Sequence, residues 1–195
     1  MSLKEITKDL HTEAEKQPFV KELFSGNIDP ELYATYLFNQ QIMYEVLEIH
    51  ANIHGLLNDL PDIRRAALIK EDYLELWTKP EIPPVLPTTH EYIQYIVTNK
   101  DNPKKLLAHI YVRHMGDLSG GQMIATKVPG EGRCYKFADP EALKTAIRAK
   151  IDDSLGDEAK ECFKFSIKFF KELMEHHDST LEWVNWSSNY AWRSI

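Results

Sequence analysis

The sequence predicts an all-α fold, a bundle of helices in a single domain. Nearly every segment of the 195 residues repeats its apolar side chains at spacings of three and four, the pattern of a helix that buries one face. No segment alternates apolar and polar residues as a half-buried strand would, and no repeat or low-complexity tract occurs. A chain of this length suits one domain with a sizeable core, so we expect residues 1–195 to form one unit.

Local signals place the helices of the first half. Ser2 and Glu5 form a capping box, and Asp29-Pro30-Glu31 combines an N-cap, a proline at the first helical position and an acid in the first turn. Gly55 is a typical helix stop. Four prolines in residues 79–87 predict a stiff, extended connector. The predicted helices of this half span residues 2–16, 18–26, 29–54 and 61–77.

The second half continues the pattern. Asp139-Pro140-Glu141 repeats the helix-start signature, whereas Val128–Phe137 has glycines, a proline and no periodicity and is expected to be a loop. Residues 179–195 form a tail rich in tryptophan, which we expect to pack against the bundle through Trp183, Trp186 and Trp192. The predicted helices of this half span residues 89–97, 103 through the following glycines, 139–151 and 158–177.

Composition excludes several functional classes. The formal net charge of −7 argues against general nucleic-acid binding, so an anionic ligand would need a local basic cluster. No run of about 18 apolar residues and no apolar leader occurs, which predicts a cytoplasmic protein without a membrane partner. Cys134 and Cys162 lack the spacing of a metal or redox pair and are expected to be reduced packing residues.

The run Gly116-Asp117-Leu118-Ser119-Gly120-Gly121-Gln122 is unusual because it follows a strongly helical segment. Each interior glycine costs a helix roughly 0.5–1 kcal/mol relative to alanine. Taken alone, the run favours a helix end with a glycine-rich turn. The alternative is a continuing helix in which Gly116 and Gly120, four residues apart, leave a strip of bare backbone for a flat ligand. The run lacks the Gly-Lys-Ser/Thr ending of a phosphate loop.

Two further groups of polar residues share helix faces. Lys4, His11 and Glu15 fall in one sector of the first helix, where the carboxylate can reach one imidazole nitrogen and leave the other free for a metal. Lys144 and Arg148 lie on one face of the 139–151 helix and could hold a carboxylate. Ordinary solvated helix faces explain either group considered alone.

Two histidine pairs complete the inventory of candidate sites. His50 and His54 are one turn apart and could form half of a metal site, but the Glu-x-x-His repeats of di-iron bundles are absent from the sequence. His176-His177 ends the last predicted helix, where a cation is favourable.

Several segments together resemble the heme oxygenase family. The run from Leu106 to Gln122 closely resembles the family's distal helix, and Lys-Asp-Leu-His-Thr-Glu-Ala-Glu at residues 8–15, continued by Phe19-Val20, resembles its proximal histidine segment. Tyr135–Phe137 with Leu143–Arg148 is similar to the helix that holds the heme propionates, and Phe163–Phe170 is similar to the helix that closes the pocket. The resemblance runs in order from about residue 3 to about residue 175, and its Gly-Asp-Leu-Ser-Gly-Gly-Gln motif is highly specific.

The resemblance implies a heme held between a proximal helix and a kinked, glycine-rich distal helix. His11 is then the axial ligand of the heme iron, Glu15 its hydrogen-bonding partner, and Asp117 the residue that organises water beside bound oxygen. The other implied positions are Gly116 and Gly120 in the distal wall, Tyr111 and Arg113 in support of the water network, Lys4, Lys144 and Arg148 at the propionates, and Phe163 at the heme edge.

The implied reaction is oxidative cleavage of heme at a meso carbon, the α carbon, which yields biliverdin, Fe²⁺ and carbon monoxide. Heme is then both cofactor and substrate, and no other metal is expected. The implied partners are O₂, reduced ferredoxin or a similar electron donor, and a downstream bilin reductase. A neutral histidine ligand, unlike a cysteine thiolate, does not strongly favour O–O cleavage, which suits attack on the ring.

Three departures from the family pattern are visible. His114 stands where many relatives have tyrosine, and the Val128–Tyr135 connection is shorter than in relatives. No hydrophobic anchor follows the last predicted helix, which favours a soluble bacterial, plastid or phage type that uses ferredoxin.

Two alternative functions remain open on sequence grounds. The first is a heme carrier or sensor that keeps the pocket without turnover, although Asp117 beside a glycine wall would be unnecessary for storage. The second is another enzyme on an all-α bundle, thiaminase-like or di-iron, which would need a cysteine nucleophile or clustered carboxylates and histidines.

Overall fold

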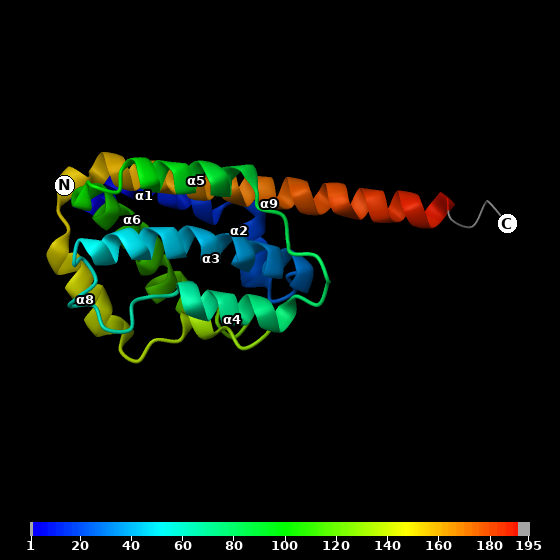
Figure 1. The fold of residues 1–195 in the computed structure, drawn as a ribbon, viewed down its shortest axis with the longest axis horizontal. Coiled ribbons are helices and arrows are strands. Elements are labelled where there is room, and N and C mark those ends of the chain that lie inside the picture. The colour runs from blue at the N-terminus through cyan, green and yellow to red at the C-terminus, as the bar shows by residue number, and fades with distance from the viewer. Residues whose placement is uncertain (1, 191–195) are drawn as a thin grey trace.

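The computed structural model describes the backbone of residues 2–190 and the side chains of residues 2–180. These residues form a helical bundle without strands (Figure 1), as predicted. The α-helices are α1 (Leu3–Glu15), α2 (Pro18–Ser25), α3 (Pro30–Ile53), α4 (Ala66–Leu76), α5 (Pro87–Thr98), α6 (Pro103–Gly116), α7 (Gln122–Ile124), α8 (Pro140–Lys150) and α9 (Gly156–Tyr190). Shorter helical turns are η1 (Asp117–Gly121), η2 (Arg133–Tyr135) and η3 (Asp153–Leu155).

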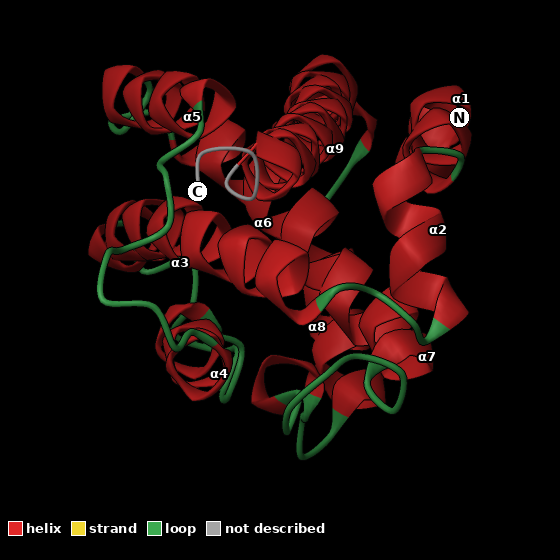
Figure 2. Ribbon diagram, turned by 90° about the vertical axis from the view of Figure 1, so that its right-hand side faces the viewer, coloured by secondary structure: helices red, strands yellow, loops and turns green. Residues whose placement is uncertain are grey.

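The long helix α3 lies at the centre of the bundle. It packs against α4, α5 and α6, while α9 packs along α1, α2 and α6 on the other side (Figure 2). Phe19, Tyr33 and Leu47 are fully buried in the shared core. The site segments α1, α6 and α8 are therefore positioned by contacts with α3 and α9 and by the η1 turn that follows α6.

The predicted helix starts at Ser2 and Asp29 are confirmed in atomic detail. Ser2 Oγ accepts a hydrogen bond from the Glu5 amide at 3.3 Å, and Glu5 Oε2 accepts one from the Ser2 amide at 2.7 Å. Asp29 Oδ1 accepts from the amides of Glu31 and Leu32, both at 2.9 Å. These contacts satisfy amides that have no partner inside the first turn of a helix.

The predicted start of α4 is wrong. The helix begins at Ala66 rather than near Pro61, because the intervening chain turns through Asp62, which has a positive φ of 64°. The residue before the helix, Arg65, supplies no side-chain cap. Its amide and that of Ala66 donate instead to Glu48 on α3, at 2.6 and 3.3 Å. A cap provided by another helix leaves no local signal in the sequence.

The last helix is longer than predicted. The backbone of α9 continues from Gly156 to Tyr190, well past the predicted end at His177, and extends beyond the rest of the bundle (Figure 1). The expectation that Trp183, Trp186 and Trp192 pack against the bundle concerns side chains outside the described residues. No helix in the described part of the chain combines the length and apolarity needed to cross a membrane.

The glycine run is part of a continuous helical segment and not a helix end. After α6 the backbone widens into one turn of π-helix, η1, and then returns to α-helix in α7. Such a turn is uncommon and is frequent at functional sites. The predicted loop 128–137 contains the short 3₁₀ turn η2, which packs against η1.

Candidate functional site

His11 lies on an exposed part of α1 beside α9. Its Nδ1 is 3.5 Å from Glu15 Oε2, and its ring packs edge-on against Phe163 with centroids 5.8 Å apart. The His11 side chain is 56% exposed, so Nε2 is left as the nitrogen that an external metal centre would use. The structure thus brings together three predicted residues from two helices.

Apolar side chains connect this surface to the glycine-rich segment. Ala14 of α1 and Phe163 of α9 belong to one buried cluster, and Val112 of α6 packs against it. Val112 precedes Gly116 by one helical turn. The part of α1 that carries His11 and the part of α6 that leads to Gly116 therefore border the same apolar region.

The three glycines of the run differ in their surroundings. A Cβ atom built on Gly116 or Gly120 would meet no heavy atom within 4 Å, so open space lies beside both. A Cβ on Gly121 would lie 2.6 Å from Cδ1 of the buried Tyr135 ring. Packing within the protein accounts for Gly121, whereas no packing contact requires glycine at the other two positions.

This difference gives a paired prediction for heme-free protein. Gly121→Ala should lower the free energy of unfolding by about 1–3 kcal/mol, because the added methyl group overpacks the core against Tyr135. Gly120→Ala should leave it unchanged or raise it by about 0.5–1 kcal/mol, because alanine favours the helical backbone. Denaturant unfolding measures both values, and equal stability of the two variants would contradict the assignment.

Asp117 is the acidic residue at the start of η1. Its Oδ2 accepts a hydrogen bond from the Tyr44 hydroxyl at 2.7 Å. Burial raises the pKa of Asp117 to about 6, although His114, Tyr44 and nearby arginines stabilise the carboxylate. A carboxyl group that changes protonation near neutral pH is suited to accept and release protons.

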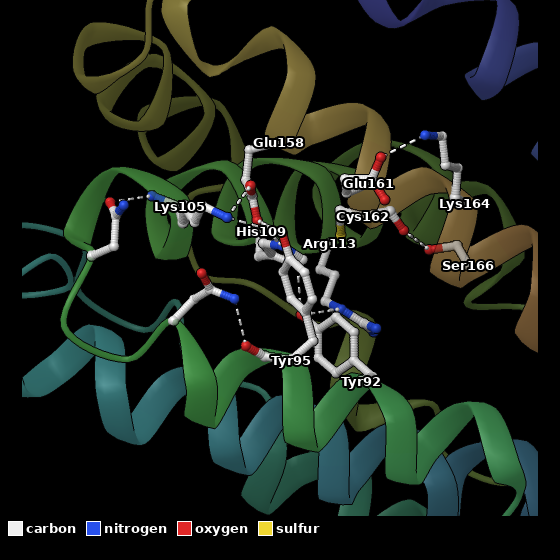
Figure 3. A network of polar contacts seen from close by, with 12 residues as sticks. Tyr92, Tyr95, Lys105, His109, Arg113, Glu158, Glu161, Cys162, Lys164 and Ser166 are labelled. Atoms are coloured by element: carbon white, nitrogen blue, oxygen red, sulfur yellow. Dashed lines mark hydrogen bonds and ion pairs between the residues drawn. The ribbon is translucent and has the colours of Figure 1, made fainter.

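Arg113 lies next to Tyr44, the residue that donates to Asp117. Its guanidinium donates to Gln40 Oε1 at 2.8 Å and lies 5.5 Å from the centre of the Tyr44 ring. Its Nε also donates to the Tyr92 hydroxyl at 3.0 Å, the start of a buried polar network (Figure 3). The predicted supporting position of Arg113 is therefore next to the partner of Asp117.

The polar network drawn in Figure 3 continues from Tyr92 to His109 and Glu158. Tyr92 Oη is 3.0 Å from His109 Nδ1, and His109 Nε2 is 3.0 Å from Glu158 Oε1. Burial opposes the charge of Glu158, yet hydrogen bonds from His109 and Tyr95 lower its pKa to about 2. This network ties α5, α6 and α9 together and holds Arg113 in place.

Tyr111 packs against two apolar clusters, the main core and the cluster of Leu3 and Ala108. Its side chain is half-buried and packs against the cluster of Leu3 and Ala108, near the charge of Arg148. No hydrogen bond joins the Tyr111 hydroxyl to Asp117 in the described structure. The geometry therefore places Tyr111 with the α1 and α8 side of the site.

Two of the three predicted basic residues, Lys4 and Arg148, are exposed. Lys144 is only 15% exposed, and its Nζ lies 2.7 Å from Glu141 Oε1. The α8 helix that carries Lys144 and Arg148 packs against η1. This packing places Lys144 and Arg148 on a helix next to the glycine-rich segment.

Sequence reasoning missed the side chains that surround Asp117 from α3. The prediction from sequence gave Tyr44, Gln40 and Glu48 no role in the site. A recognisable signal was present for Glu48, because an acidic residue stood one turn after Tyr44 on the buried face of a long helix.

Other candidate sites find less support in the geometry. His54 Nε2 is 2.7 Å from the Lys100 carbonyl oxygen, and the described residues contain no group of three His, Cys, Asp or Glu side chains arranged to hold a metal ion. Cys134 and Cys162 are buried free thiols.

A comparison with protein-family models matches residues 1–172 to Heme_oxygenase, the heme oxygenase family. The chain belongs to the heme oxygenase family. Its members are oxidoreductases that degrade heme to biliverdin, with heme as both substrate and prosthetic group.

Individual relatives agree with the family assignment. Heme oxygenase 2 of Macaca fascicularis is 30% identical over 88% of this chain, and the chain spans 64% of that relative's length. A heme oxygenase structure from Leptospira interrogans is 26% identical with a TM-score of 0.76, covering 88% of this chain and all of that chain. The heme complex of heme oxygenase-1 from the cyanobacterium Synechocystis sp. PCC6803 has the same fold, with a TM-score of 0.78 at 23% identity, covering 95% of this chain and 96% of that one.

The residues present fit a heme group. Gly116 and Gly120 border open space, His11 is exposed beside the aromatic ring of Phe163, and α8 supplies exposed positive charge. A flat apolar ring with a central metal and anionic substituents matches this donor set.

Proposed function

We propose that this chain is a heme oxygenase that converts heme to biliverdin, Fe²⁺ and carbon monoxide with O₂. The observation that carries the proposal is the open space beside Gly116 and Gly120, in the same helical segment as Asp117, whose pKa burial raises to about 6. Bound heme supplies the iron centre that takes electrons and reacts with O₂.

Each residue of the proposed site would have a separate role toward bound heme. His11 would ligate the iron through Nε2 while Glu15 holds Nδ1. Gly116 and Gly120 would let the main chain approach the ring, and Asp117 would hold and move protons at its Oδ atoms while Tyr44 orients it. Phe163 would pack at the ring edge, and Lys4, Lys144 and Arg148 would face its carboxylates.

Finer features of the reaction follow from the family resemblance. We propose cleavage at the α-meso carbon, reduced ferredoxin or a similar protein as electron donor, and a bilin reductase as the consumer of the product. The exposed basic residues near the site are suited to steer an acidic donor.

A cheap experiment tests the proposed function. Hemin is added to the protein, the Soret band is recorded, and ascorbate or reduced ferredoxin is supplied under air. Loss of the Soret band with growth of a bilin absorption supports the oxygenase. A ferrous complex that persists without bilin formation would favour a heme carrier or sensor.

The propionate positions are tested by charge reversal. Lys144→Glu with Arg148→Glu should weaken heme binding by about tenfold or more or change the bilin isomer, because two favourable charges become repulsive. Lys150→Glu is the matched control on the same helix, since Lys150 pairs with Asp59 at 2.5 Å. Heme titration and chromatography of the products measure both effects. Unchanged affinity and isomer would place the propionates elsewhere.

A further inference from the structure

A groove along the C-terminal half of α3 lies outside the site proposed for heme. It has a volume of about 230 Å³ and runs between α3 and the start of α4, two helices that pack side by side (Figure 1). None of the residues proposed to touch heme lines this groove. Its walls consist of Glu45, Glu48, Ile49, Asn52 and Ile53 on α3, together with Arg64 and Ala66.

The middle of the groove is apolar and open to solvent. Ile49 is 52% exposed and Ile53 is 71% exposed, and they are two of the six large apolar side chains that are exposed in the described part of the chain. The two isoleucines are four residues apart, so they share one face of α3. Neighbouring apolar side chains exposed in a groove are typical of a surface that contacts another molecule.

The two ends of the groove carry opposite charges. Glu45 lies one turn before Ile49 and Asn52 lies almost one turn after it, which separates these ends by about 10 Å along the helix axis. Arg64 donates a hydrogen bond to the Asn52 side chain, so its guanidinium lies at the Asn52 end. Within the described residues Arg64 forms no ion pair, and the Glu45 carboxylate accepts only from Gln41 at 2.7 Å.

The third charged residue of the groove, Glu48, is already satisfied inside the protein. It is only 6% exposed, and its carboxylate accepts hydrogen bonds from the amides of Arg65 and Ala66. The imidazole Nε2 of His114 lies 3.1 Å from the same carboxylate. The charges that remain available to another molecule are therefore those at the two ends.

This order of groups is complementary to itself. A two-fold rotation about an axis near Ile49 reverses the direction of α3 in a second copy of the chain. The rotation places Glu45 of each copy opposite Arg64 of the other, and Ile49 opposite its own equivalent. An interface of this symmetry contains every favourable contact twice, because one patch serves both chains. Arginine also pairs well with a carboxylate, since its planar fork matches the two oxygens.

We propose that this groove is the interface of a homodimer in which the α3 helices of two copies pack antiparallel. The second copy covers Ile49 and Ile53, and two Glu45–Arg64 ion pairs flank the apolar contact. The patch is small beside the interfaces of obligate dimers, so the dimer forms reversibly. The proposal is independent of the proposed function, because no residue assigned to heme takes part in it.

The first test measures the mass of the full chain by sedimentation velocity, from micromolar to millimolar concentrations. The wild type should change from monomer to dimer, and Ile49→Glu should weaken the dimer about tenfold or more, because two carboxylates would face each other across the axis. Ile82→Glu is the matched control, since Ile82 is a 70% exposed isoleucine outside the groove. A wild type that stays monomeric, or an Ile49→Glu variant that dimerises like the wild type, would overturn the proposal.

The second test exchanges the charges at the two ends. Glu45→Arg and Arg64→Glu should each weaken the dimer about tenfold or more, because each places like charges opposite one another at both ends. An equimolar mixture of the two variants should dimerise as the wild type does, since every arginine then faces a carboxylate. Native mass spectrometry with a tag on one variant identifies the mixed dimer. Misfolded variants could not produce this recovery, and a mixture that stays monomeric while the wild type dimerises would place the interface elsewhere.

Discussion

Asp117→Ala is expected to keep heme binding and to lose bilin formation by about 100-fold or more, within the usual range for removal of a proton-transfer group. Asp117 is the acidic group of the π-helical turn, and Tyr44 orients it through a 2.7 Å hydrogen bond. Heme binding should survive because it depends on His11, the glycine wall and the basic residues. The measurement is a Soret titration followed by single-turnover bilin yield.

The matched control is Ser119→Ala, an exposed position in the same turn. It changes a neighbouring side chain without touching the carboxyl group and should leave the bilin yield near that of the wild type. An unchanged yield in Asp117→Ala would remove this residue from the mechanism. Equal losses in both variants would indicate a general disturbance of the turn.

The same carboxyl group should affect stability in a pH-dependent way. Burial raises the pKa of Asp117 to about 6, above its ordinary value, so the folded protein binds this proton more tightly than the unfolded chain. Ionisation therefore costs stability, and the cost grows as pH rises from about 4 to about 6. Asp117→Asn should be more stable than the wild type by roughly 1–3 kcal/mol at about pH 7.5, with the gain fading toward about pH 4.

His11→Ala is expected to abolish the normal axial ligation of bound heme. The loss of turnover should exceed the roughly 10–100-fold typical for an outer hydrogen-bonding partner such as Glu15, because the ligand itself is removed. Absorption and resonance Raman spectra of the heme complex measure the ligation. Imidazole added in solution should restore the spectrum, since His11 occupies an exposed position that a small molecule can reach.

His50→Ala provides the control for this prediction. His50 is a half-buried histidine on α3, away from the α1 and α9 pair. The His50→Ala variant should leave the heme spectrum unchanged. A wild-type spectrum in His11→Ala, or a changed one in His50→Ala, would show that another histidine ligates the iron.

Much of the helical framework could be predicted from local sequence. The capping residues Ser2 and Asp29 act on amides two or three positions away, so their effect is contained in the sequence itself. The pairing of His11 with Glu15 is equally local, because residues four apart meet on any helix. The family motif is the basis on which we propose that these local features serve one heme site.

The prediction failed where a contact came from another helix. The start of α4 was placed too early because its cap is Glu48, 17 residues before Arg65 in the chain. The end of α9 was also placed too early, since its backbone runs as one helix from Gly156 to Tyr190. The glycine run taken alone favoured a helix end, but in the structure the backbone continues through a π-helical turn into α7.

By itself the sequence determined the all-α class, most helix spans and the family, because these depend on spacing and on short motifs, and it supplied most residues of the site that we propose. Only the tertiary structure decided which glycines border open space, that Tyr44 donates to Asp117, and that the His114 ring lies against Glu48. The physical reason is that cavities, desolvation and shifted pKa values arise when helices distant in the chain exclude water from one another. Those properties belong to the packed interface between helices and to no single segment.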